Sequence, residues 1–256
     1  MPPLGAAHTH AMARAGTHEF VQKLLEPLPR GRVLDVPAGR GAMSQWLHGR
    51  GFEVTACDLY PDIFEAEEVS VQRGDLNQPL PFSDGAFDCV VCIEGLEHLE
   101  NPHQAVREFA RLLRRGGRAI ITVPNILNIE ERVKNLLYGY TSHFKPISHA
   151  HLAQRRGDFE QWRQQAGELD EVFLHVHPIA YPELRFILES NGFEGVEVFR
   201  DRAKPRQWLY FPLVWLVRLI AALRPAEEKD ARWTRELSSS AILLGGNSIV
   251  VVAARS

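Results

Sequence analysis

Short apolar runs alternate with amphipathic stretches along the first half of the chain. Runs rich in Val, Leu, Ile and Ala, most of them bounded by Gly, Pro or Asp, predict buried strands. These runs lie at 32–36, 52–57, 67–73, 86–93 and 118–123. Apolar residues at helical spacing predict helices at 19–28, 42–50 and 102–113. Strands and helices that alternate with short connections predict an α/β fold with a doubly wound, Rossmann-like parallel sheet.

The first of these strands runs through an acidic residue into a tight turn, VLDVPAGRG at 33–41. A dinucleotide site offers its pyrophosphate a glycine-rich turn and the positive end of a helix, and the Asp35 carboxylate would repel those phosphates. The acid instead suits a ligand without phosphate that carries an ammonium and a sulfonium group, which is S-adenosylmethionine. Gly39 and Gly41 would let the backbone approach that ligand closely. The alternative is an ordinary turn between a strand and a helix.

Acidic residues also follow the next two strands. Asp58 stands just past the second strand, where a carboxylate can accept from both hydroxyls of an adenosine ribose. Its alternative role is to cap a loop. Asp75, after the third strand, can accept from the exocyclic amine of adenine, and Leu76 can flank the ring. Because the carboxyl ends of parallel strands share one edge of a sheet, we expect these side chains to surround one cofactor.

The composition is that of a globular protein, with 45% hydrophobic and 24% charged residues in a chain of 256. This length suits a single domain at 19–256, preceded by a flexible arm at 1–18 that has no apolar core of a secretory signal. The net charge of −3 gives no electrostatic reason to expect nucleic acid as a partner. Residues three apart in a strand face opposite sides, so Cys89 and Cys92 are expected to pack rather than to form a redox or zinc pair. We therefore expect a cytoplasmic protein.

Five motifs, in order over 31–125, resemble those of the class I S-adenosylmethionine-dependent methyltransferases. They are VLDVPAGRG, CDLYP, RGDLNQPLPF, FDCVVCIEGLEHLENP and LLRRGGRAIITVPN. The resemblance is greatest to the branch that includes the ubiquinone-biosynthesis O-methyltransferases and many bacterial enzymes acting on small molecules or saccharides. It implies that Ala38, Leu59 and Glu94 also contact the cofactor. Pro37 stands where the family more often has glycine, and we expect it to stiffen the turn.

The same resemblance implies a seven-stranded sheet whose last strand is antiparallel and lies beside the fifth strand. We place the two remaining strands at 193–200 and 248–254, the former after a helix at 181–190. All seven strands then belong to the one domain.

Two long insertions remain, at 125–179 and 201–247. Loops of this length are usually functional or carry their own structure. The first contains a helical run at 127–138 and then several histidines, and we interpret it as a helical cap over the acceptor. The second contains an apolar segment at 208–223, flanked by cations and shorter than the roughly 20 residues of a membrane span. It would suit a helix at a bilayer surface, a grip on a lipid-linked acceptor, or a helix buried against its own domain or a dimer mate.

Residues able to assist methyl transfer cluster after the fourth strand. If a helical turn begins there, Glu94, Glu97 and His98 stand on one face of it. His98, with Glu97 beside it, could act as a general base toward an acceptor hydroxyl. The same three residues could instead hold a divalent cation, Mg²⁺ or Mn²⁺, that lowers the pKa of that hydroxyl, or His98 could be structural. Glu-x-x-Glu-His is similar to the cation-binding motif of the ubiquinone O-methyltransferases and of small-RNA 3′-terminal 2′-O-methyltransferases, and that resemblance implies His177 as the fourth ligand.

The expected function is therefore an S-adenosylmethionine-dependent methyltransferase acting on an oxygen of a small-molecule, sugar or lipid-linked acceptor. One alternative is an RNA 2′-O-methyltransferase with a Glu-x-x-Glu-His metal site, which the acidic balance of charge disfavours. The other is a non-catalytic, cofactor-binding interaction protein of the same fold. The segment 208–223 is the predicted place for a peripheral membrane contact or for dimerisation.

Overall fold

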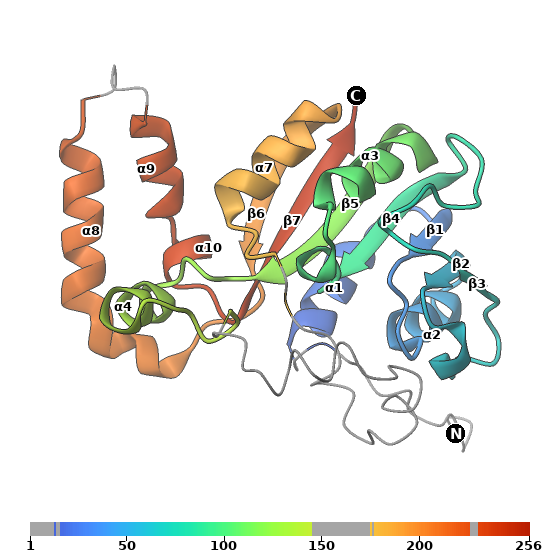
Figure 1. The fold of residues 1–256 in the computed structure, drawn as a ribbon, viewed down its shortest axis with the longest axis horizontal. Helices are drawn as coiled ribbons and strands as arrows, with labels where there is room; N and C mark the ends of the chain where they lie inside the picture. The colour runs from blue at the N-terminus through green and yellow to red at the C-terminus, as the bar shows by residue number, and fades with distance from the viewer. Residues whose placement is uncertain (1–12, 14–15, 145–174, 176, 226–229) are drawn as a thin grey trace.

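The computed structural model of the chain describes residues 13, 16–144, 175, 177–225 and 230–256 (Figure 1). Its centre is a seven-stranded sheet in the order β3-β2-β1-β4-β5-β7-β6. The strands are β1 (Arg32–Asp35), β2 (Glu53–Asp58), β3 (Val71–Arg73), β4 (Phe87–Ile93), β5 (Leu113–Pro124), β6 (Phe193–Arg200) and β7 (Ser248–Arg255). β7 is antiparallel to both of its neighbours, and every other neighbouring pair is parallel. The predicted Rossmann-like sheet with an antiparallel last strand is confirmed.

Two strands begin several residues away from the predicted start, whereas β2 and β4 begin one residue later than predicted. β5 already starts at Leu113, which pairs with Phe87, so the arginine and glycine stretch that connects the predicted helix to the predicted strand lies inside the strand. The register between β4 and β5 shifts just after Phe87, where the Asp88 carboxylate forms an ion pair with Arg114. The strand β5 therefore extends in front of the apolar run 118–123, through the irregular part of its pairing with β4. β3 starts only at Val71 because the residues before it form a hydrogen-bonded turn.

Helices cover both faces of the sheet (Figure 1). They are α1 (Thr17–Leu25), α2 (Ala42–Gly49), α3 (Pro102–Leu112) and α7 (Tyr181–Ser190). α1 and α2 pack on one face, and α3 and α7 pack on the other. Cys89 belongs to the first of these two cores and Cys92 to the second, and both thiols are buried and free. The prediction that these cysteines pack on opposite faces is confirmed.

The described parts of the two insertions are helical and lie together beyond β6, at one end of the molecule (Figure 1). They contain α4 (Ile129–Tyr138), the 3₁₀ turn Pro205–Tyr210, α8 (Phe211–Leu223), α9 (Ala231–Leu237) and α10 (Ser240–Leu243). Ile129, Val214 and Leu243 form a small shared core between three of these helices. The helix predicted at 127–138 is present, whereas the histidine-containing loop lies outside the described residues from position 145 on. No helix in the described ranges is long and apolar enough to cross a membrane.

Both insertions begin and end at the carboxyl edge of the sheet. β5 ends at Pro124 and β6 ends at Arg200, and the antiparallel β7 starts at Ser248, opposite Pro124. The chain therefore enters and leaves each insertion at the edge where β1, β2 and β4 also end. Open α/β sheets bind their ligands at this edge.

Candidate cofactor and acceptor site

The turn after β1 packs closely against the turn after β4. Gly39 and Gly41 have φ angles of 54° and 90°, in the left-handed region that favours glycine. A Cβ on Gly41 would lie 2.7 Å from a ring carbon of Phe64, so this position excludes a side chain. A Cβ on Gly95 would lie 2.5 Å from Cδ of Pro37, and the peptide bond before that proline is cis. The proline in the cofactor turn is thus accommodated by a glycine after β4.

Asp58, at the end of β2, holds this turn to the sheet. Its Oδ2 accepts a hydrogen bond from the Gly39 N–H at 2.7 Å, and its Oδ1 accepts one from the Tyr60 N–H at 2.8 Å. The Ala38 N–H donates to the carbonyl of Cys57 at 3.0 Å. Asp58 therefore caps a loop, which was the alternative role. Each carboxylate oxygen has a second lone pair, so the same side chain retains the capacity to accept from two ribose hydroxyls.

Asp35 ends β1 with its side chain buried. The Ser44 hydroxyl at the start of α2 donates a hydrogen bond to Asp35 Oδ2 at 2.6 Å. Burial raises the pKa of Asp35 to about 7, the Ser44 bond acts in the opposite direction, and the neighbouring Asp58 charge adds to the rise. A positively charged ligand nearby would favour the ionised form. This acid is therefore suited to a cationic ligand.

The residues predicted to hold adenine lie after β3. Asp75 Oδ1 accepts from the backbone N–H and from the side-chain amide of Asn77, at 2.8 and 3.1 Å. Asn77 Oδ1 accepts in turn from the N–H of Glu100 at 3.2 Å, which connects this turn to the loop after β4. Leu76 is buried in the core that includes α3, and Leu59 is exposed. Asp75 thus sits in a turn that is fixed to the loop carrying the candidate catalytic residues.

Glu94, directly after β4, has a left-handed backbone. Its φ is 49°, a conformation that costs a residue with a side chain about 1–2 kcal/mol. Two hydrogen bonds to Thr122 of β5 hold it there, because the Glu94 N–H donates to the threonine hydroxyl and the hydroxyl donates to Glu94 Oε1, each at 2.9 Å. The predicted helical turn is a short 3₁₀ turn that begins only at Leu96. Strain that neighbours hold in place is typical of functional sites.

Glu97 is the buried acid of this site. It lies in the 3₁₀ turn, it is 0% exposed, and neither carboxylate oxygen has a hydrogen-bond partner in the part of the chain that the structure describes. Burial raises the pKa of Glu97 well above its usual range, and the neighbouring Glu94 charge raises it further. A buried carboxylate with no hydrogen bond is costly unless a proton or a cation neutralises it.

Two imidazoles lie beside this carboxylate. The potential ligand atoms of Glu97, His98 and His175 all lie within 4.8 Å of one another. The rings of His98 and His175 are also 4.8 Å apart, in an edge-to-face arrangement. Nδ1 of His175 lies 3.1 Å from the carbonyl oxygen of His143, which fits donation from Nδ1–H and leaves the lone pair of the ring on Nε2.

His177, the predicted fourth ligand, is not a member of this group. Its Nε2 lies 3.0 Å from Glu183 of α7, and its backbone N–H donates to the carbonyl of Glu97 at 3.0 Å. His175 stands beside Glu97 and His98 in its place. The two histidines stand only two positions apart in the sequence. What distinguishes them in the structure is the contact of His177 with Glu183, and the spacing of the residues does not predict that contact.

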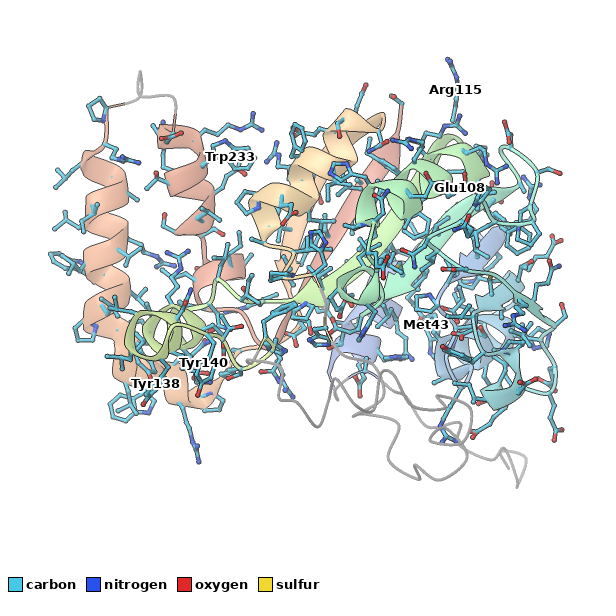
Figure 2. All side chains as sticks on the ribbon, viewed as in Figure 1. Met43, Glu108, Arg115, Tyr138, Tyr140 and Trp233 are labelled. Atoms are coloured by element: carbon cyan, nitrogen blue, oxygen red, sulfur yellow. The ribbon has the colours of Figure 1, made fainter. Side chains whose placement is uncertain are left out.

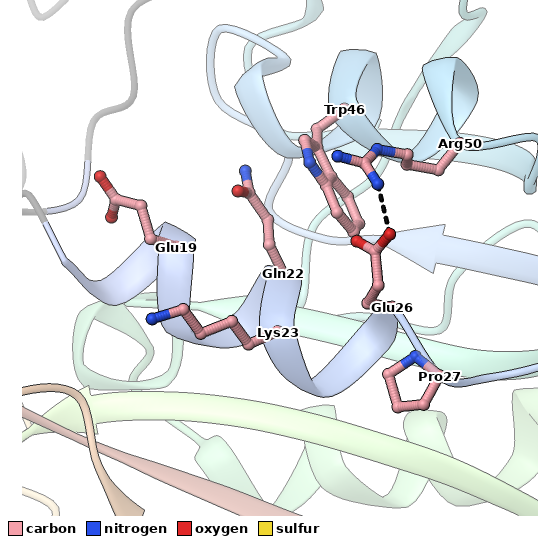
Figure 3. A pocket seen from close by; sticks show the side chains of 7 residues that line it. All are labelled: Glu19, Gln22, Lys23, Glu26, Pro27, Trp46 and Arg50. Carbon is pink, nitrogen blue, oxygen red and sulfur yellow. Dashed lines mark hydrogen bonds and ion pairs between the residues drawn. The ribbon is translucent and has the colours of Figure 1, made fainter.

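A separate surface hollow of about 500 Å³ lies between α1 and α2 (Figure 3). The guanidinium of Arg50 forms an ion pair with Glu26 across it and lies 5.1 Å from the ring centre of Trp46. None of the predicted cofactor or acceptor residues lines this hollow. It is therefore distinct from the site at the carboxyl edge.

Comparisons with known proteins agree with this geometry. Residues 34–121 match the family described as a methyltransferase domain. A ubiquinone biosynthesis O-methyltransferase of Xanthomonas axonopodis pv. citri is 31% identical over 173 residues, which cover 60% of this chain and 69% of that protein. The protein of the same name from Xanthomonas euvesicatoria pv. vesicatoria is 32% identical over 176 residues, with the same shares covered.

A solved structure shares the fold as a whole. It is an S-adenosylmethionine-dependent methyltransferase from Archaeoglobus fulgidus, with a TM-score of 0.56 and 19% identity over 93% of this chain and 94% of that one. Together with the seven-stranded sheet, these relatives show that the chain is an S-adenosylmethionine-dependent methyltransferase of class I and belongs to the family of the ubiquinone biosynthesis O-methyltransferases.

Proposed function

We propose that this methyltransferase acts on an oxygen of a small-molecule, saccharide or lipid-linked acceptor, and that Glu97, His98 and His175 hold a divalent cation beside it. The observation that carries the cation is the fully buried Glu97 carboxylate, which has no hydrogen-bond partner among the described residues and lies next to two imidazoles. The names of the Xanthomonas relatives support oxygen as the acceptor atom.

The acids at the carboxyl edge have the right charge for the cofactor. S-adenosylmethionine supplies a methyl group on a positively charged sulfur, so the leaving group needs no further activation. Asp35 would balance the positive charge, Asp58 would accept from the ribose, and Asp75 would accept from adenine. The backbone would approach the cofactor closely at Ala38, Gly39 and Gly41. The remaining proposed contacts with the cofactor are those of Leu59, Leu76 and Glu94. The main task left to the protein is to orient the acceptor.

The proposed ligands combine one carboxylate oxygen with two imidazole nitrogens. Mg²⁺ prefers oxygen ligands, whereas imidazole favours transition metals, so this set fits Mn²⁺ better than Mg²⁺. Bound there, the cation would lower the pKa of the acceptor hydroxyl. Without a cation, the imidazole of His98 could instead accept the proton of that hydroxyl.

The test is transfer of a labelled methyl group to separate lipid, saccharide, small-metabolite and RNA fractions. We expect label in a fraction other than RNA, loss of transfer in EDTA, and better recovery with Mn²⁺ than with Mg²⁺. Label confined to RNA would contradict the proposed acceptor, and full activity in EDTA would contradict the cation.

A pair of histidine variants isolates the cation ligands. His175→Ala should weaken Mn²⁺ binding at least about tenfold in a calorimetric titration, with little change in the affinity for S-adenosylhomocysteine. His48→Ala is the matched control, because His48 is an exposed histidine on α2 that pairs with Glu68. Equal Mn²⁺ affinity in the two variants would remove His175 from the ligand set.

A further inference from the structure

α8 is the helix that lies farthest from the sheet (Figure 1), and its exposed side is apolar. Val214 and Ala221 face inward and are buried. The opposite side of the helix exposes large apolar side chains along its whole length. They are Phe211, Trp215, Leu216, Leu219, Ile220 and Leu223, and the preceding 3₁₀ turn adds Trp208 and Leu209. We call these eight residues the α8 surface.

A second group of exposed apolar residues lies nearby. It comprises Leu136, Leu137, Tyr138 and Tyr140, at the end of α4, and α4 packs against the same 3₁₀ turn. Tyr138 and Tyr140 lie at the lower end of this helical region (Figure 2). The two groups together hold 12 of the 14 exposed large apolar side chains that the structure describes, and the other two are Leu59 and Phe186. Such a concentration marks an interaction surface rather than scattered exposure.

Positive charge accompanies the α8 surface. Residues 202–225 contain five Lys or Arg and no Asp or Glu, in a chain whose net charge is −3. Arg202 pairs with Asp201 and Lys204 pairs with Glu130, which leaves three arginines near the helix. Arg206 is exposed at the start of the 3₁₀ turn, before Trp208. Arg218 donates to the carbonyl of Ser238 and to the hydroxyl of Ser240, and Arg224 donates to the hydroxyl of Thr234. Cations thus border the apolar side chains at both ends of the helix.

We propose that the α8 surface docks on an anionic lipid bilayer, with α8 lying in the plane of the membrane. The helix has 13 residues, too few to span a bilayer, which needs about 20. Tryptophan and other aromatic side chains favour the level of the lipid headgroups, and Trp208, Phe211 and Trp215 all belong to this surface. The flanking arginines would then meet lipid phosphates, which supply the negative charge that residues 202–225 lack.

A second copy of the chain is the less favoured occupant. In a two-fold symmetric contact the same patch meets itself, so antiparallel α8 helices would bring the end that carries Arg206 against the end that carries Arg224. These two like charges disfavour the contact, although Glu227, Glu228 and Asp230 follow Arg224 in the sequence. A lipid surface buries the same apolar side chains and attracts the cations.

Docking also agrees with the place of the insertion in the fold. The chain leaves the sheet toward α8 at the carboxyl edge, after Arg200, and returns to that edge at Ser248. The helix that carries the α8 surface is therefore connected at both of its ends to the edge of the sheet where acceptors are expected. The docking itself rests on the exposed side chains and not on the proposed acceptor or cation.

The experiment is co-sedimentation of the full chain with vesicles of phosphatidylcholine and phosphatidylglycerol, and with vesicles of phosphatidylcholine alone. Trp215→Glu should lower binding to the anionic vesicles about tenfold or more, because it places a charge in the centre of the α8 surface. Phe186→Glu is the matched control, since Phe186 is 62% exposed and Trp215 is 66% exposed. It should bind like the wild type.

A second pair tests the charge. Arg206→Glu should weaken binding to the anionic vesicles and leave weak binding to phosphatidylcholine unchanged. Arg115→Glu should have no effect, because Arg115 projects from the far end of the molecule (Figure 2). Failure of the wild type to sediment with anionic vesicles would overturn the proposal. Equal binding of Trp215→Glu and Phe186→Glu to the anionic vesicles would also overturn it. A third contrary result is a wild type that does not bind vesicles but sediments as a dimer, which Trp215→Glu dissociates. Each of these results leaves the methyl-transfer and Mn²⁺ assays unaffected, so docking and the proposed function fail separately.

Discussion

Replacement of Glu97 by Gln should make the fold more stable when no divalent cation is bound, and should reduce the stability that the fold gains from binding one. Without a cation, the pKa of the wild-type carboxyl is well above its usual value because the group is buried, and additionally because Glu94 is near. At any pH between the unfolded and folded pKa values, the folded state binds more protons than the unfolded state. The free energy of unfolding therefore falls as the pH rises, by up to about 1.4 kcal/mol per pH unit.

A glutamine cannot ionise, so in the variant position 97 contributes nothing to the change of the free energy of unfolding with pH. We expect Glu97→Gln to become progressively more stable than the wild type as the pH rises above the ordinary carboxyl pKa, in the presence of EDTA. Asp35 has a pKa raised to about 7 and contributes a slope of its own, but it is present in both proteins and largely cancels in the difference.

A bound cation should invert this order. A ligand at about 100 times its Kd stabilises the folded state by about 2.7 kcal/mol. The wild type should receive most of this gain, because its carboxylate offers a full negative charge between two imidazoles, whereas the amide of Gln offers only a neutral oxygen. With saturating Mn²⁺ at neutral pH, the wild type should therefore gain about 2 kcal/mol more than the variant.

The assay is urea unfolding followed by tryptophan fluorescence, over a pH series from about 5 to about 8, with EDTA or with Mn²⁺. Glu100→Gln is the control, because Glu100 is an exposed acid in the same loop. It should follow the wild type under every condition. If the wild type and Glu97→Gln show the same pH slope and gain equally from Mn²⁺, the interpretation of Glu97 as a cation ligand is refuted.

Three further substitutions test the cofactor turn. Asp58→Ala removes acceptors for the Gly39 and Tyr60 N–H groups, so it should lower the free energy of unfolding by about 1–3 kcal/mol and weaken calorimetric binding of S-adenosylhomocysteine; unchanged binding would contradict the ribose role. Asp35→Asn should gain stability relative to the wild type as the pH rises from about 4 to about 7, since a raised carboxyl pKa costs stability over that range; parallel pH profiles in urea unfolding would contradict this. Gly95→Ala should lower the free energy of unfolding by about 1–3 kcal/mol, because its Cβ would lie 2.5 Å from Pro37. Gly49→Ala is the control: its Cβ would have no atom within 4 Å, so it should raise the free energy of unfolding by about 0.5–1 kcal/mol. Equal shifts of the melting temperature in the two variants would contradict the close packing of the two turns.

Apolar periodicity predicted the sheet well because most strands are buried on both faces. The helix Tyr181–Ser190 and the strand Phe193–Arg200 have the bounds that the sequence predicted. The start of β5 was missed because an ion pair between Asp88 and Arg114, not an apolar run, accompanies its first residues. Side-chain pairing between distant strands leaves no periodic signal in either strand alone.

In the candidate site, too, some positions were predictable from the strands and others were not. Asp35 and Asp58 were predictable because each follows an apolar strand, and parallel strands bring their carboxyl ends to one edge. The position of His175, rather than His177, beside Glu97 and His98 was not predictable, because His177 instead contacts Glu183 on α7. Glu97 is buried without a hydrogen-bond partner among the described residues, which is a property of the assembled fold and the observation from which the cation is inferred.

The two halves of the site also differ in what builds them. Short turns after β1, β2 and β3 carry the predicted cofactor residues, and hydrogen bonds to the sheet fix them, as between Asp58 and Gly39. On the acceptor side, Glu97 and His98 come from the turn after β4 and His175 comes from the first insertion. Both insertions begin at the same edge, after Pro124 and after Arg200. In this chain the second insertion carries the exposed apolar helix α8, so the proposed membrane docking and the choice of acceptor can be tested in the same segment.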